Sequence, residues 1–139
     1  MALILVDTSA WVEFDRATGS PSDVRLTELI GQTAEIAVTE PVIMEVASGA
    51  RTTQREWQLR RLLARFQLLP FDSIVDFDGA VHVYRTCRAS AVTPRGLIDC
   101  MIAAVATRNG ASILAHDRDF ARVAHLMGID LEAGSLIES

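Results

Sequence analysis

The chain has 139 residues, of which 13 are basic and 18 are acidic, so its formal net charge is −5 at pH 7 with histidine neutral. This length fits one domain over residues 1–139, and the apolar composition excludes a disordered or collagen-like chain. All of the basic residues are arginine, which excludes Schiff-base enzymes, Walker-A nucleotide sites and lysine-dependent kinases. The acidic balance argues against binding nucleic acid by bulk charge, so such a role needs local arginines or metal ions.

The sequence carries neither a membrane-span pattern nor an export signal. No apolar run approaches the ~18 residues of a membrane span, and the first apolar run reaches Asp7 without a basic segment before it. Cys87 and Cys100 are the only cysteines, which is too few for a disulfide framework. We therefore expect a soluble, cytoplasmic protein without a membrane partner, whose two thiols stay reduced and pack in the interior.

The first half of the chain alternates short apolar runs with segments of helical periodicity. Asp7-Thr8-Ser9 follows the first run as a turn with helix-capping residues, and Thr39 and Gly49 are placed to begin and end a later helix. In chain order we expect a strand over 2–6, a helix from Ala10, a helix over 21–33, a strand over 36–38, a helix between Thr39 and Gly49, and an arginine-rich helix over 53–66. The inward face of the last helix is predicted to be Trp57, Leu59, Leu62, Leu63 and Phe66.

The second half continues the alternation. In chain order we expect a strand or connector over 67–70, a helix over 74–91 with Phe77, Val81 and Tyr84 at helical spacing, a helix over 97–109 ended by Gly110, a strand over 112–115, a helix over 118–127 ended by Gly128, and a short strand over 130–132. Residues 133–139 are expected to fray. Strands that alternate with helices pair in parallel through right-handed crossovers, so we predict an α/β fold: a three-layer α/β/α sandwich around a central, mainly parallel sheet.

Acidic residues follow two of the expected strands. Asp7 comes directly after the first strand, and Asp117 follows the fourth after one histidine. In an open parallel sheet, ligands bind in the crevice beyond the carboxyl ends of the strands, which makes both residues candidates for a binding site. Each of them taken singly could instead be an N-cap of the helix that follows.

Two further acids lie within segments that are otherwise apolar. Glu45 is in Val42–Ala47 and Asp99 is in Leu97–Ala106, and neither run contains a basic residue. A buried, ionised carboxylate needs a partner or must lose its charge, unless it points outward through a narrow solvent gap. Four such acids together match the oxygen ligands that Mg²⁺ or Mn²⁺ prefers, whereas the histidines and cysteines lack zinc-ligand spacing.

The acidic residues lie in motifs that resemble those of a known nuclease family. Asp7–Trp11 after an apolar strand, Glu40–Val46, Leu97–Ala104 and Ile113–Phe120 are similar, in order and spacing, to the successive motifs of PIN-domain ribonucleases. The short chain is similar to the VapC toxins of VapBC toxin–antitoxin pairs. The resemblance covers almost the whole chain, and one departure is Ala115, where many members carry a hydroxyl residue.

The resemblance implies a set of site residues and a mechanism. The catalytic acids would be Asp7, Glu45, Asp99 and Asp117, and the ligands of Mg²⁺ or Mn²⁺ would be Asp7, Asp99, Asp117 and Asp119. Thr8 or Ser9 would hold Asp7 or a water by a hydroxyl hydrogen bond. Two-metal phosphodiester hydrolysis fits this set, with Asp7 between the ions and Glu45 binding metal or orienting the water.

The resemblance also implies an activity and partners. It predicts an endoribonuclease toxin that cleaves structured RNA, either transfer or ribosomal RNA, and so inhibits translation. It predicts a homodimer and a complex with a cognate VapB-like antitoxin, for which Trp11, Phe14 and Trp57 could line a groove. The candidates for RNA contacts are Arg51, Arg55 and Arg118, the first two from an arginine run that extends to Arg65.

Two other functions remain open at this point. A binding or scaffold protein could keep the PIN fold and cleave nothing, although an intact acidic quartet argues against it. A phosphoaspartyl protein, either a receiver domain or a haloacid-dehalogenase-like phosphatase, also places an Asp after its first strand. Both of these classes expect a lysine that this chain lacks, and the phosphatase expects an Asp where this chain has Ser9.

Overall fold

A four-stranded sheet forms the centre of the computed structural model, which describes residues 3–32 and 34–137. The strands are β1 (Ile4–Val6), β2 (Ile36–Val38), β3 (Gln67–Leu68) and β4 (Ser112–Leu114). They lie in the order β3-β2-β1-β4, and every pairing between them is parallel. β1, β2 and β4 lie within the predicted strands, and the segment predicted as a strand or connector forms the two-residue strand β3.

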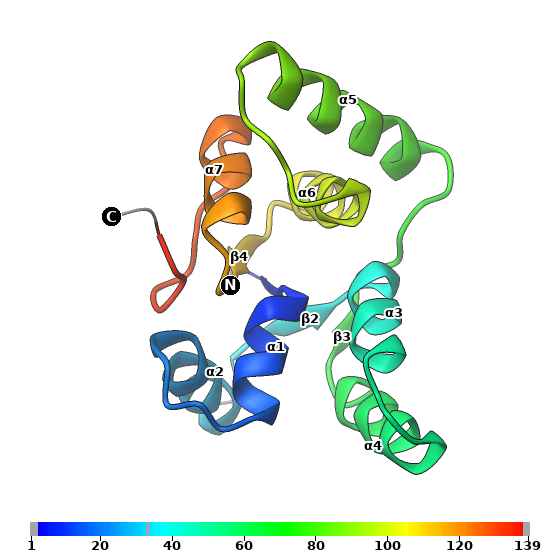
Figure 1. Cartoon of the computed structure of the whole chain (residues 1–139), viewed down its shortest axis with the longest axis vertical. Coiled ribbons are helices and arrows are strands. Elements are labelled where there is room, and N and C mark those ends of the chain that lie inside the picture. The colour runs from blue at the N-terminus through cyan, green and yellow to red at the C-terminus, as the bar shows by residue number, and fades with distance from the viewer. Residues whose placement is uncertain (1–2, 33, 138–139) are drawn as a thin grey trace.

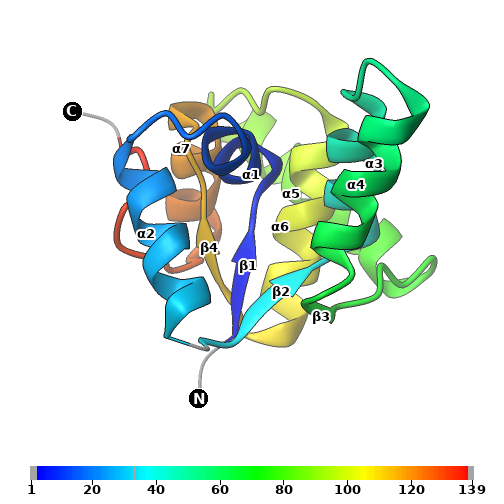
Figure 2. The same ribbon diagram turned by 90° about the horizontal axis from the view of Figure 1, so that it is seen from below.

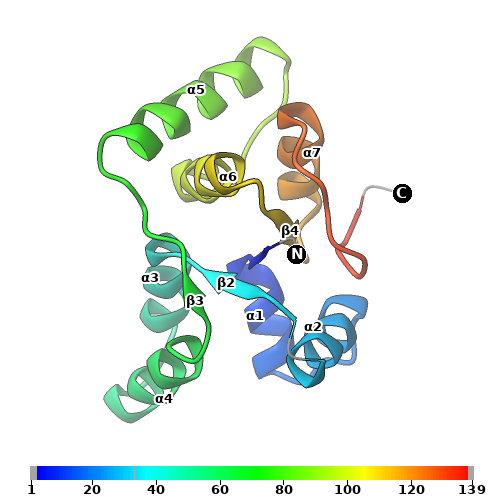
Figure 3. The same ribbon diagram turned by 180° about the vertical axis from the view of Figure 1, so that it is seen from behind.

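Helices cover both faces of this sheet, which confirms the predicted three-layer α/β fold (Figures 1 and 2). The helices are α1 (Thr8–Asp15), α2 (Pro21–Gly31), α3 (Glu40–Ser48), α4 (Thr53–Leu63), α5 (Val75–Ala89), α6 (Leu97–Asn109) and α7 (Arg118–Met127). As Figure 3 shows from behind, α5, α6 and α7 lie on one side of the sheet and α1 and α2 on the other, with α3 and α4 beside the β2–β3 edge.

The strand order places a topological switch point at the middle of the sheet. From β1 the chain moves to β2 and β3 on one side, and then crosses to β4 on the other side of β1. The exits of β1 and β4 are therefore neighbours, and the backbone N–H of Asp7 donates to the carbonyl of Leu114 at 2.9 Å. Loops that diverge at a switch point leave a crevice between them, which is where the site lies.

The ends of the helices follow the capping residues in the sequence. Asp7 caps α1 and Asp117 caps α7, each with a side-chain oxygen that accepts backbone N–H groups of the first turn. The N-cap interpretation of both acids is thus confirmed. Gly110 and Gly128 end α6 and α7 in the left-handed conformation, at φ +62° and +70°, which glycine adopts without a steric cost.

The predicted inward face of α4 is wrong at Trp57. Leu59 and Leu63 are buried, but Trp57 is 59% exposed, and the guanidinium of Arg61 lies 4.7 Å from the centre of its ring. The helix ends at Leu63, so Phe66 follows it and packs against the ring of Trp11 at 5.3 Å. Trp57 is therefore a surface residue rather than a core residue.

The helical spacing on α5 is confirmed, but its apolar residues lie at the surface. Phe77 and Val81 are exposed and border a cavity of about 300 Å³. The buried positions of α5 are instead Asp76, Val83 and Cys87. Cys87 and Cys100 are both free and buried, as predicted.

The C-terminal segment differs from the prediction. Residues 130–132 form a single parallel bridge between Leu131 and Ile113 rather than a strand. Residues 133–137 were expected to fray, but the N–H of Leu136 donates to the carbonyl of Ala115 at 2.8 Å, and Ser22 Oγ donates to the carbonyl of Gly134 at 2.7 Å. The predictions for residues 2, 33, 138 and 139 fall outside the described residues.

Among residues 3–32 and 34–137, no helix combines the length and the apolar character that crossing a membrane requires.

Candidate active site

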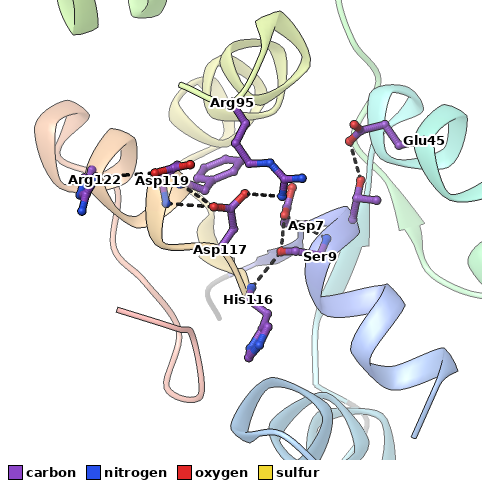
Figure 4. A network of polar contacts seen from close by, with 10 residues as sticks. Asp7, Ser9, Glu45, Arg95, His116, Asp117, Asp119 and Arg122 are labelled. Carbon is purple, nitrogen blue, oxygen red and sulfur yellow. Dashed lines mark hydrogen bonds and ion pairs between the residues drawn. The ribbon is translucent and has the colours of Figure 1, made fainter. Parts of the chain in front are cut away.

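A cavity of about 570 Å³ lies at the carboxyl edge of the sheet, beyond β1 and β4. It brings together the four acids that the sequence singled out, from the exits of β1 and β4 and from α3 and α6. The lining residues are Asp7, Thr8, Ser9, Val12, Glu13, Glu45, Arg95, Gly96, Leu97, Ile98, Asp99, His116 and Asp117. Figure 4 shows the polar contacts among several of them.

Asp7 is held by Ser9 on one of its two oxygens. The hydroxyl and the backbone N–H of Ser9 both donate to Asp7 Oδ2, at 2.5 and 3.0 Å. Ser9 Oγ in turn accepts the backbone N–H of His116 at 2.8 Å, which ties the start of α1 to the exit of β4. The other oxygen, Asp7 Oδ1, is buried and has no hydrogen-bond partner among the described residues.

Asp117 is held by backbone groups on one side and by an arginine on the other. Asp117 Oδ1 accepts the N–H of Asp119 at 2.9 Å, and Arg95 Nη1 lies 3.1 Å from Asp117 Oδ2. Asp117 is 8% exposed, whereas the side chain of Arg95 is 65% exposed. Arg95 therefore reaches into the cavity from a loop at the surface.

Asp99 and Glu45 complete the acidic lining. Asp99 is in the first turn of α6, is 8% exposed, and has an Oδ2 atom without a partner in the described part of the chain. Glu45 lies on α3 and accepts a hydrogen bond from the hydroxyl of Thr8 at 2.7 Å. Of the two hydroxyl residues predicted to support Asp7, Ser9 makes that contact, whereas Thr8 supports Glu45 instead.

Burial and like charges raise the pKa of two of these carboxyl groups. Desolvation is the main cause for Asp7, whose pKa rises to about 6 although the hydrogen bonds from Ser9 lower it. Desolvation also leads for Asp99, followed by the charges of Asp7, Asp117 and Glu45, and raises its pKa to about 7. At neutral pH the site therefore holds ionised carboxylates at a cost to the metal-free fold.

The donor chemistry of the cavity fits a hard divalent cation. Its acidic oxygens include two buried atoms without hydrogen-bond partners in the described part of the chain, Asp7 Oδ1 and Asp99 Oδ2. A cation bound in the cavity would give each of them a partner. Within residues 3–32 and 34–137, no three acidic, histidine or cysteine side chains are already close enough to share one ion. The carboxylates would thus have to draw together around a cation.

Several predicted site residues lie elsewhere in the described structure. Asp119 contacts Arg122 at 3.6 Å on the surface of α7, so its role as a further ligand stays a prediction. Arg55 pairs with Asp15, and Arg51 and Arg118 are exposed. Of the three predicted groove residues, Trp11 belongs to the core, Phe14 is half-buried and Trp57 is exposed.

The described lining of the cavity also contains three residues with ionisable side chains that were not predicted as site residues. They are Glu13, Arg95 and His116, and His116 Nε2 lies 3.5 Å from Glu13 Oε1. Arg95 had a sequence signal, because it stands four residues before Asp99, next to the start of the same helix. Glu13, in the second turn of α1, had no such sequence signal.

Comparisons with known proteins agree with this geometry. A family model described as the PIN domain matches residues 4–126. VapC ribonuclease Mb1587 of Mycobacterium bovis and ribonuclease VapC11 of Mycobacterium tuberculosis are each 41% identical over 128 residues, which is 91% of this chain and 96% of the relative.

Solved structures share the fold at lower identity. VapBC2 from Rickettsia felis, bound to a DNA fragment from its promoter, has a TM-score of 0.72 at 17% identity and covers 94% of this chain and 97% of that one. VapC20 of Mycobacterium tuberculosis, a sarcin-ricin loop cleaving toxin, has a TM-score of 0.64 at 17% identity, over 86% and 93% of the two chains. On the family match and the identity to its relatives, the chain belongs to the PIN-domain family, within the VapC ribonucleases.

Proposed function

We propose that residues 1–139 form a single PIN nuclease domain that acts as a metal-dependent endoribonuclease toxin in the cytoplasm. The observation that carries the proposal is the pair of buried carboxylate oxygens without partners, Asp7 Oδ1 and Asp99 Oδ2, in a cavity lined also by Asp117 and Glu45. A buried anion without a counter-charge costs free energy, so a fold that keeps two of them is expected to bind a cation there. The relatives named ribonucleases support the reaction class.

Some residues of the cavity would hold the ion, and others orient the carboxylates of those ligands. Asp7, Asp99 and Asp117 would hold Mg²⁺ or Mn²⁺, and Asp119, from the start of α7, would be a further ligand. When bound, the ion lowers the pKa of the attacking water and stabilises the leaving oxygen of the phosphodiester. Ser9 fixes the orientation of Asp7, and Thr8 fixes that of Glu45, which binds the ion or orients the water.

The first prediction concerns the metal. RNA cleavage is expected to require Mg²⁺ or Mn²⁺ and to stop in EDTA, because the described cavity offers a single arginine and no lysine to replace the charge of the ion. Cleavage of transfer and ribosomal RNA by wild type and by Asp7→Asn, followed on gels with each ion and with chelator, tests this. Undiminished cleavage in EDTA would rule the proposal out.

The substrate is proposed to be structured RNA. VapC20, which shares the fold, is a sarcin-ricin loop cleaving toxin, and this supports a structured RNA target. Arg51, Arg55 and Arg118 are proposed RNA contacts outside the cavity lining. A panel of transfer RNAs and ribosomal RNA fragments, with the cut sites mapped, identifies the bond.

The protein partners are proposed to be a cognate VapB-like antitoxin and a second copy of the chain. The neighbour from Rickettsia felis is a VapBC complex, which supports the first of these. The exposed apolar residues of α5, such as Phe77, and the exposed Trp57 are surface that a partner could cover. Co-expression with the adjacent reading frame and mass measurement of the purified complex test both partners.

The second prediction concerns Ser9, whose hydroxyl joins Asp7 to the backbone of His116. Ser9→Ala is expected to reduce cleavage at pH 7 about 10- to 100-fold, because a group that orients a metal ligand is lost. The hydrogen bond from Ser9 lowers the pKa of Asp7, so the acid limb of the pH–rate profile should also move to higher pH. Thr107→Ala, which removes a hydroxyl from α6 outside the cavity, is the matched control. A pH–rate profile that stays in place would refute this role for Ser9.

A further inference from the structure

The acidic cavity contains an arginine of its own chain. The carboxylates in its described lining belong to Asp7, Glu13, Glu45, Asp99 and Asp117, and the lining includes one guanidinium, that of Arg95. An RNA phosphate that approaches so many carboxylates is repelled unless a cation faces it. Among the described lining residues, Arg95 is the one whose positive charge does not depend on pH.

The contact that Arg95 makes is a single one. Nη1 lies 3.1 Å from Asp117 Oδ2, and the side chain is 65% exposed. Figure 4 shows the guanidinium extended toward Asp117 and Asp7. The hydrogen bond to Asp117 is the main cause that raises the pKa of Arg95, followed by the charge of Asp117 and, to a smaller extent, the charges of Asp99 and Asp7.

Arg108 shows what a fixed arginine looks like in this protein. Its Nε and Nη2 donate to the two oxygens of buried Asp76, at 2.9 and 2.8 Å, and Nη2 also donates to the carbonyl of Pro70 at 2.7 Å. These contacts fix the guanidinium in one geometry. Among the described residues Arg95 has one polar contact, and its side chain is solvated, so it can leave Asp117 at little cost once another cation takes its place.

A divalent cation in this cavity would compete with Arg95. The cation and the guanidinium would both use Asp117 Oδ2, because Oδ1 already accepts a backbone N–H. The two positive charges also repel each other at close range. A guanidinium released from a carboxylate keeps its planar fork of N–H donors, which matches the oxygens of a phosphate.

We propose that Arg95 is an internal counter-ion that a divalent cation displaces from Asp117, and that the released guanidinium then binds a phosphate of the RNA substrate. This inference rests on the proposed function. It assigns to Arg95 two successive partners, a carboxylate in the metal-free protein and the substrate in the metal-loaded one.

Metal binding tests the first half of the exchange. Isothermal titration with Mn²⁺ at pH 8, where Asp7 and Asp99 are ionised, compares wild type with Arg95→Gln, Arg95→Lys and the control Arg88→Gln, an exposed arginine of α5 outside the cavity. Arg95→Gln is expected to bind Mn²⁺ about five- to tenfold more tightly, because binding no longer displaces a cation. Arg95→Lys and Arg88→Gln should remain close to wild type.

Substrate kinetics test the second half. At saturating Mn²⁺, Arg95→Gln is expected to raise the KM for a transfer RNA about tenfold with a smaller change in kcat, and to reduce the salt dependence of binding by about one phosphate contact. Arg95→Lys should recover part of the loss, because it keeps the charge and lacks the fork. A purely structural role would instead weaken metal binding and lower the melting temperature together.

Each outcome decides part of the proposal. Mn²⁺ affinity that is unchanged or weaker in Arg95→Gln overturns the counter-ion, and tighter Mn²⁺ binding with an unchanged KM overturns the phosphate contact. If wild type itself fails to bind Mn²⁺, the proposed function fails, which is distinct from a failure of the Arg95 comparison. If Arg95→Gln does not fold, Arg95→Met keeps the aliphatic stem without the charge and allows the same comparison.

Discussion

Replacing Asp99 by asparagine is expected to abolish RNA cleavage and to leave the metal-free protein as stable as wild type or more so. Asn keeps the shape of the side chain and removes one charge from a cavity in which Asp7, Asp117 and Glu45 all raise the pKa of Asp99. Loss of a ligand to the ion should lower cleavage by about a thousandfold or more. The melting temperature in EDTA should stay equal or rise by roughly 5 °C, since a repulsive, desolvated charge is gone.

Asp76→Asn is the matched control, because Asp76 is also a buried acid in a helix. It pairs with Arg108 rather than lining the cavity, so its replacement should cost about 3 kcal/mol or more while the folded protein still cleaves RNA. Thermal melts in EDTA, beside a cleavage assay, separate the two roles. A destabilised but active Asp99→Asn would remove Asp99 from the site and make it a structural acid like Asp76.

The fold was predictable because local signals and long-range order agree along this chain. Short apolar runs alternate with helical segments, and capping residues such as Asp7 and Gly110 mark where helices begin and end, so the parallel sheet follows from connection rules. The wrong predictions concern which apolar residues of a helix are buried, because this depends on what packs against the helix. Trp57 and Phe77 have the spacing of core residues, but no layer covers the sides of α4 and α5 on which they lie.

The acidic residues could be identified from the sequence, whereas their contacts could not. Asp99 and Glu45 are single charges in apolar segments, and Asp7 and Asp117 leave strands that the topology makes neighbours. Arg95 could be suspected from its place four residues before Asp99, but Glu13 could not, and the loop before α6 and the orientation of α1 bring both residues to the cavity. The pairing of Thr8 with Glu45, 37 positions apart, depends likewise on how α1 packs beside α3.

The stability of the metal-free protein is expected to fall as the pH rises from 5 to 8. The pKa values of Asp7 and Asp99, about 6 and about 7, lie above the 3.8 of an unperturbed aspartate. Between these values the native state holds more protons than the unfolded state, so each unit of rising pH favours unfolding until both groups are ionised. Glu13 and Asp72 have lowered pKa values and act in the opposite direction, but only below this range, because both are already ionised by pH 5.

Mn²⁺ should reverse this dependence, because it binds the ionised carboxylates of the native state and stabilises that state by mass action. In EDTA, the melting temperature of wild type is expected to be about 5–10 °C lower at pH 8 than at pH 5, and excess Mn²⁺ should raise it far more at pH 8. In Asp99→Asn, the fall should shrink and end near pH 7, because Asp7, with a pKa of about 6, is then the one of the two that still titrates. The effect of Mn²⁺ should nearly vanish. Scanning calorimetry across this range, with and without Mn²⁺, measures both effects. A melting temperature in EDTA that does not change from pH 5 to 8 would mean that the native state does not raise the pKa of these two carboxyl groups. The cavity would then gain no stability from a bound cation by neutralising them.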